Sequence, residues 1–161
     1  MQPTNFQFSY DVYDSIDELD KNDAALLRKA QEVTAFAYAP YSNFRVGATA
    51  QLANGQTVSG SNQENASYPV GLCAERVLLA SVSSQYPNIP VESMAISYNS
   101  ETASNDHPIA PCGICRQSLQ EYESRMGQPI RLILGGMKGK VYVISSAAML
   151  LPFSFTDEDL K

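Results

Sequence analysis

Residues 73–98 read CAERVLLASVSSQYPNIPVESMAISY, and this stretch predicts a helix followed by a strand. Its first part, from Cys73 to about Tyr86, lacks proline and glycine and clusters apolar side chains as a buried helix does. Val91–Tyr98 has the length and the apolar content of a strand. Helices that alternate with single strands are typical of layered α/β proteins.

The same alternation continues on both sides of this stretch. An Asn-Gly pair at Asn54-Gly55 predicts a hairpin, because this pair is the strongest short turn signal between strands. The remaining expected elements are a helix from Asp20 or Asn22 that stops before Pro40, hairpin strands at 46–53 and 56–61, a helix from Cys112 to about Met126, strands at 130–134 and 141–144, and a short last helix from Ser145 or Ser146. Strands joined through helices lie parallel and hairpin strands lie antiparallel. The sequence therefore predicts a three-layer α/β/α fold with a mixed five-stranded sheet.

Two parts of the chain differ in pattern. Residues 1–19 read as an N-terminal extension in which alternate positions are apolar, as in a strand or an extended packing arm; these positions are Phe6, Phe8, Tyr10 and Val12. Residues 20–161 contain no internal repeat and no linker, so we expect a single domain there.

Composition restricts the class of partner. The 161 residues include 17 acidic and 11 basic side chains, which gives a formal net charge of -6. Nonspecific binding to nucleic-acid phosphates requires an excess of lysine and arginine over acidic residues, so nucleic acid is not the expected partner. The longest apolar runs, such as Ala147–Leu151, are far shorter than a membrane span, and the polar start Met1–Asn5 does not resemble a signal peptide. We expect a soluble cytoplasmic protein that does not bind membranes.

The three cysteines carry the strongest chemical signal. Their odd number disfavours a complete disulfide framework, and each of Cys73, Cys112 and Cys115 stands at the predicted start of a helix. A helix N-terminus stabilises negative charge and therefore favours thiolates, which bind zinc. Three protein ligands leave one tetrahedral position of zinc open for water, and Glu75 lies two residues after Cys73. The pattern indicates a catalytic zinc site with a carboxylate beside it.

Two half-motifs together match a known pattern. Zinc nucleobase deaminases combine a His or Cys ligand, one residue and Glu with a later Pro-Cys-x-x-Cys. Here the two parts are Cys73-Ala74-Glu75 and Pro111-Cys112-Gly113-Ile114-Cys115. On these motifs the chain resembles the small cytidine deaminases that act on free nucleosides, and the resemblance extends over residues 37–155.

The resemblance implies a reaction and its machinery. The reaction would be zinc-dependent hydrolytic deamination of cytidine and deoxycytidine to uridine and deoxyuridine, with release of ammonia, in pyrimidine salvage. Cys73, Cys112 and Cys115 would hold one Zn²⁺ per subunit, and Glu75 would carry protons between water and the base. Arg76 would donate hydrogen bonds to a ligand sulfur and offset the negative charge of three thiolates.

The resemblance also implies how the nucleoside is bound. The segment 38–48 is similar to an entry segment whose phenylalanine lies against the pyrimidine, and the segment 62–68 is similar to a ribose-binding segment. The implied substrate-binding residues are Phe44, Asn62, Glu64, Tyr68, Ala74 and Phe155. The counterpart of Phe155 closes the site of a neighbouring subunit, so the resemblance implies a homo-oligomer, a tetramer with shared active sites. Gln63 and the segment 69–72 depart from the usual family pattern.

Other interpretations remain open on the residues alone. Cys112 and Cys115 have the spacing of a redox dithiol, and His107 is a candidate fourth ligand for a closed zinc site in a noncatalytic binding module. Phe44 and Phe155 have the character of ordinary core aromatics, and His107 that of a solvated loop residue. Among deaminases, the alternatives are enzymes that act on a base within a polynucleotide, which the net charge disfavours, and enzymes that act on a cytosine-containing antibiotic nucleoside.

Overall fold

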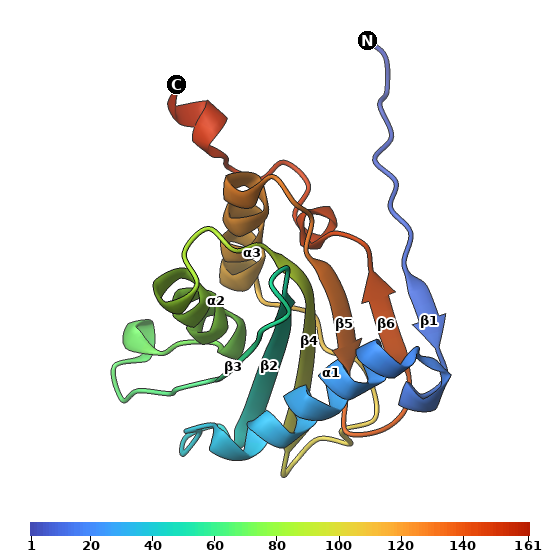
Figure 1. Cartoon of the computed structure of the whole chain (residues 1–161), viewed down its shortest axis with the longest axis vertical. Helices are drawn as coiled ribbons and strands as arrows, with labels where there is room; N and C mark the ends of the chain where they lie inside the picture. Colours follow the sequence, from blue (N-terminus) through green and yellow to red (C-terminus); the bar gives the residue numbers. More distant parts are fainter.

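A six-stranded mixed sheet lies at the centre of the computed structural model, which describes residues 1–161 (Figure 1). The strand order is β1-β6-β5-β4-β2-β3. The strands are β1 (Asp11–Tyr13), β2 (Phe44–Leu52), β3 (Thr57–Ser61), β4 (Val91–Ser100), β5 (Arg131–Gly135) and β6 (Val141–Ile144). β4 and β5 pair in parallel, whereas the other neighbouring strands pair antiparallel. This arrangement confirms the mixed α/β sheet.

Helices cover both faces of the sheet and complete the three layers. The helices α2 (Ala74–Gln85) and α3 (Gly113–Met126) lie on one face, and α1 (Lys21–Val33) lies on the other (Figure 1). A buried hydrophobic cluster lies on each face of the sheet, and alternate residues of β4 contribute to one or the other. Met94 and Ile96 pack toward α2 and α3, and Ala95 packs toward α1. This alternation follows from the period of a strand, which points successive side chains to opposite faces.

The structure corrects two of the expected elements. The sheet has six strands rather than five, because Asp11–Tyr13 pairs with β6 and places Val12 opposite Tyr142. The expected last helix is instead a single 3₁₀ turn, η4 (Ala147–Leu150). Leu151 departs from helical geometry and Pro152 follows it, so the segment has no room for an α-helix. None of the helices combines the length and the apolar character that crossing a bilayer requires.

One glycine allows α2 to pack closely on the edge strand β3. A Cβ atom built on Gly60 would lie 2.7 Å from the carbonyl oxygen of Ala74 and 2.7 Å from the backbone nitrogen of Leu78. These distances are shorter than real Cβ contacts, and both neighbours belong to the helix backbone. Only glycine fits here, so Gly60 sets the position of the first turn of α2, which carries Glu75 and follows Cys73.

Candidate active site

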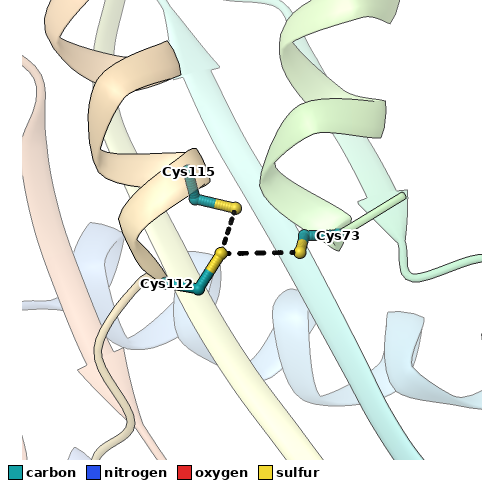
Figure 2. A group of neighbouring side chains, drawn as sticks. All are labelled: Cys73, Cys112 and Cys115. Carbon is teal, nitrogen blue, oxygen red and sulfur yellow. Dashed lines mark hydrogen bonds between the residues drawn. The ribbon is translucent and has the colours of Figure 1, made fainter. Parts of the chain in front are cut away.

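The N-termini of α2 and α3 converge on one point and bring the three cysteines together (Figure 2). Cys73 is the N-cap of α2, Cys112 is the N-cap of α3, and Cys115 lies in the first turn of α3. The Sγ atoms of Cys73 and Cys112 are 3.8 Å apart, and those of Cys112 and Cys115 are 3.5 Å apart. All three sulfurs lie within 4.8 Å of one another.

This spacing fits a zinc ion. Tetrahedral zinc with Zn–S bonds of about 2.3 Å requires sulfurs that are about 3.8 Å apart. The sulfur separations of 3.8 and 3.5 Å require only small side-chain adjustments to meet this condition. His107 lies outside the cluster, so the three cysteines leave a fourth position open. The site therefore has the donor set of a catalytic rather than a closed structural zinc centre.

The surroundings of the cluster favour a thiolate. A hydrogen bond from Cys115 lowers the pKa of the Cys73 thiol to about 6, and the Cys112 hydrogen bond and the positive charge of Arg76 act in the same direction. The N-terminus of α2 adds a positive potential at the same place. The same hydrogen bond raises the pKa of the Cys115 thiol, so the cluster without a metal holds its negative charge at Cys73. A thiolate is the form of cysteine that binds metal ions.

Glu75 is a buried carboxyl group beside the cluster. It lies in the first turn of α2 and is 4% exposed. Burial raises the pKa of this carboxyl, and the nearby charge of Cys73 raises it further. A carboxyl group in such surroundings holds a proton more readily than one in water, which is the property a proton-transfer group needs.

A cavity of about 570 Å³ opens onto Glu75 and the cluster. Its volume lies within the range of small-molecule sites, roughly 300–1,000 Å³. Its lining includes most of the site residues predicted from the sequence: Phe44, Asn62, Glu64, Tyr68, Cys73, Glu75, Arg76 and Cys112. The folded chain thus brings segments that are far apart in the sequence to one cavity.

Three predicted site residues do not line this cavity. Cys115 and Ala74 are wholly buried, Cys115 within the sulfur cluster and Ala74 between Cys73 and Glu75. Phe155 lies outside the cavity with a 58% exposed side chain, and its backbone carbonyl accepts a hydrogen bond from Gln117 Nε2 at 2.8 Å. Within one chain, therefore, Phe155 does not contribute to the site.

Asn62 and Glu64 hold the walls of the cavity in place. Asn62 Oδ1 accepts from the backbone N–H of Val46 at 2.7 Å, and its Nδ2 donates to the carbonyl of Phe44 at 3.0 Å. Glu64 Oε2 accepts from the backbone N–H of Tyr41 at 2.8 Å. The hydroxyl of Ser42 also donates to Glu64, and this bond lowers the pKa of the Glu64 carboxyl. Both residues therefore connect the segment that carries Phe44 to the residues that follow β3.

Sequence reasoning missed the residues that support the site from behind. The ring of Tyr98 stacks on Phe44, with centroids 5.1 Å apart and an interplanar angle of 11°. Arg116 donates from Nε to the carbonyl of Pro111 at 2.8 Å and from Nη1 to the carbonyl of Leu150 at 3.0 Å, which anchors the turn before Cys112. Arg116 directly follows the motif cysteine Cys115, so its position in the sequence could have indicated a supporting role. The pairing of Tyr98 with Phe44 depends on the register of β2 against β4, which the sequence alone does not give.

Residues 20–127 match the family described as the cytidine and deoxycytidylate deaminase zinc-binding region. The chain belongs to this deaminase family. Among curated deaminases, the cytidine deaminase of Halalkalibacterium halodurans is 35% identical over 84% of this chain and 96% of the relative. The cytidine deaminase of Mycoplasma genitalium is 42% identical over 60% of this chain and 70% of the relative.

Solved deaminase structures agree with the fold. The crystal structure of cytidine deaminase from Burkholderia pseudomallei superposes with a TM-score of 0.69 at 39% identity, covering 81% of this chain and 97% of that one. Because the deaminase family consists of hydrolytic enzymes, this chain is an enzyme of that class and not a redox dithiol protein or a noncatalytic binding module.

Proposed function

We propose that this deaminase converts cytidine and deoxycytidine to uridine and deoxyuridine with release of ammonia, as a zinc-dependent step of pyrimidine salvage. The observation that carries the proposal is the cavity in which Phe44, the cysteine cluster and the buried carboxyl of Glu75 meet. The relatives named cytidine deaminase support cytidine as the substrate.

Cys73, Cys112 and Cys115 are the proposed ligands of one Zn²⁺ per subunit. When bound, zinc supplies a Lewis acid that lowers the pKa of water at its open position toward about 7. Arg76 lies on the cavity wall, and its positive charge lowers the pKa of the Cys73 thiol. The structure contains no hydrogen bond between the Arg76 guanidinium and a cysteine sulfur, so the proposed role of Arg76 is to offset thiolate charge at a distance.

Glu75 is the proposed proton carrier. Its carboxylate accepts a proton from the attacking water and delivers it to N3 of the base, which makes C4 electrophilic. The remaining hydroxide adds at C4. Glu75 then takes the proton of the new C4 hydroxyl and passes it to the 4-amino group, the C4–N bond breaks as the C4 carbonyl forms, and ammonia leaves. Burial suits Glu75 to this task, because its raised pKa brings the protonated and ionised forms closer in energy.

The cavity suits a nucleoside without a phosphate. Phe44 offers an aromatic face for the pyrimidine, and Asn62 and Glu64 are the proposed partners of the sugar hydroxyls. Arg76 is the only lysine or arginine that lines the cavity, and its positive charge lowers the pKa of the Cys73 thiol. No basic side chain other than Arg76 would be available to bind a 5′-phosphate, and the carboxylates of Glu64 and Glu75 in the cavity would repel it.

Association of subunits is part of the proposal. Phe153 and Phe155 are strongly exposed, and so is Tyr68 on the cavity rim, with a 77% exposed side chain. Exposed aromatic side chains of this kind are typical of residues that a partner covers. We propose a homotetramer in which Phe155 of one subunit closes the cavity of its neighbour.

The test of the function is an assay of three compounds. Incubation with cytidine, deoxycytidine and free cytosine, followed by absorbance at the cytosine band and by ammonia release, should show turnover of both nucleosides. Inactivity on both nucleosides would overturn the proposed function.

A further inference from the structure

Phe44 and Tyr98 form a stacked pair on the face of the sheet that carries α2 and α3. The strands β2 and β4 are neighbours in the sheet (Figure 1). Phe44 begins β2, and Tyr98 lies near the end of β4, opposite Val46. Because side chains two residues apart on a strand share a face, Phe44 and Val46 point to the same side as Tyr98. The rings are nearly parallel, at 11°, with centroids 5.1 Å apart.

The two rings differ in their access to the cavity. Phe44 is half-buried and lines the cavity, whereas Tyr98 is wholly buried and does not. Tyr98 covers one face of the Phe44 ring, so a base in the cavity could stack only on the other face of that ring. A flat base that enters the cavity would complete a stack of three rings.

His107 holds the far end of Tyr98. The Tyr98 hydroxyl and His107 Nδ1 share a hydrogen bond of 3.2 Å, and the His107 ring meets the Tyr98 ring edge-on with centroids 5.7 Å apart. The hydroxyl of a wholly buried tyrosine needs such a partner, because an unpaired buried polar group is costly. Tyr98 is thereby held in one orientation by Phe44 at its face and His107 at its hydroxyl.

We propose that Tyr98 is a positioning residue whose ring holds Phe44 in the orientation that stacks on the pyrimidine, and so sets nucleoside affinity. This inference rests on the proposed function. Tyr98 does not touch the reacting atoms, so its loss weakens binding of the ground state and the transition state alike. Such a change raises KM and leaves kcat unaltered.

The first test separates the ring from the hydroxyl. In Tyr98→Leu the stack is lost, and KM for cytidine should rise roughly two- to tenfold, the range expected for one aromatic pair, with kcat unchanged. In Tyr98→Phe the ring is retained and only the hydrogen bond to His107 is lost, so KM should return to within about twofold of the wild-type value. An unchanged KM in Tyr98→Leu, or a KM equally raised in both variants, would overturn the inference.

A double-mutant cycle then tests whether Tyr98 acts through Phe44. Phe44→Leu should raise KM, and adding Tyr98→Leu should raise it little further, because the second residue then has no stacking partner. Additive effects on KM would contradict the inference. If Tyr98→Leu does not fold, Tyr98→Met enters the same cycle, since a flexible methionine fills a buried gap without an aromatic face.

A second buried tyrosine provides the matched control. Tyr122 on α3 is 3% exposed and donates its hydroxyl to the carbonyl of Ile89 at 2.9 Å, but it does not line the cavity. Tyr122→Leu should lower the thermal midpoint without raising KM for cytidine. A KM that rises equally in Tyr122→Leu and Tyr98→Leu would assign the effect to general destabilisation and refute the inference. If the wild-type protein in this series does not turn over cytidine, the proposed function fails and the inference fails with it.

Discussion

Cys73 and Cys112 begin different helices, yet their Sγ atoms lie 3.8 Å apart. The strand β4 separates these helices in the sequence, so the contact is made only when both helices pack on the same face of the sheet. Each helix contributes its positive N-terminus to the same point, and the first turn of α2 adds Glu75. The proposed chemistry depends on this convergence.

Glu75→Gln should retain the fold and the metal but lose nearly all turnover. Glutamine keeps the size of the side chain but cannot accept and release protons, and a general acid–base group contributes roughly 10²- to 10⁴-fold in rate. Since Glu75 is proposed to act in several steps, the loss of kcat should reach or exceed the upper end of this range. The measurements are steady-state kinetics with cytidine and zinc content per chain. Glu121→Gln, on the exposed side of α3, is the control and should leave kcat unaltered. Near-normal kcat in Glu75→Gln would contradict the proposed role.

Arg76→Ala should impair catalysis while zinc remains bound. The Arg76 charge lowers the pKa of the Cys73 thiol, and its removal leaves three thiolates with less compensation. Loss of a residue that supports metal ligands typically costs roughly 10- to 100-fold in activity or metal affinity. Kinetics at saturating zinc distinguish a loss of catalytic activity from a loss of zinc affinity. Lys29→Ala, an exposed residue of α1, is the charge-matched control. Unchanged kinetics in Arg76→Ala would show that its charge has no role in the reaction.

Gly60→Ala should displace the first turn of α2. Its new Cβ would lie 2.7 Å from the Ala74 carbonyl oxygen, so the helix must move or the strand must bend. Overpacking of this kind costs about 1–3 kcal/mol, and the expected results are a lower thermal midpoint and weaker zinc binding. The control is Ser59→Ala, the adjacent residue, whose hydroxyl bonds Thr49 on the opposite face of the sheet. If both variants bind zinc with wild-type affinity, the close contact of α2 with β3 does not position the proposed ligand Cys73.

Nucleotides should be poor substrates. The cavity lining contains one arginine and no lysine, and that arginine lies beside the cysteine cluster. We expect kcat/KM for deoxycytidine 5′-monophosphate to be lower than that for deoxycytidine by at least about 100-fold, equivalent to the roughly 3 kcal/mol cost of an unpaired buried charge. The measurement is kcat/KM for both compounds under identical conditions. Equal kcat/KM values would place a phosphate-binding group in the cavity and contradict the nucleoside assignment.

The sequence predicted those parts of the fold and site that depend on local spacing. The apolar run from Val77 to Val82 predicted α2, and the placement of three cysteines at helix starts predicted that they would meet. Helix propensity, capping position and motif spacing act within a few residues, so they can be read along the chain. Family membership and the mixed α/β sheet are confirmed, whereas the roles of the individual site residues stay predictions.

Features that depend on contacts between distant segments were missed. The alternation of Phe6, Phe8, Tyr10 and Val12 predicted a strand or an extended arm, but it could not predict that Asp11–Tyr13 would join the sheet as a sixth strand. That pairing depends on the free backbone groups of β6, which lies far along the chain. The stack of Phe44 on Tyr98 requires the register of β2 against β4, which sequence spacing does not contain. His107 was expected to be a solvated loop residue, and although it is exposed, it bonds the hydroxyl of Tyr98.

Titration of zinc into metal-free protein tests the central claim most directly. Cytidine deamination should rise in proportion to added zinc and reach its maximum at one ion per chain, because the clustered Cys73, Cys112 and Cys115 are the proposed ligands of a single zinc site. Uridine and ammonia should appear in equal amounts throughout. Full deamination by the metal-free protein, or no deamination at any zinc level, would contradict the account.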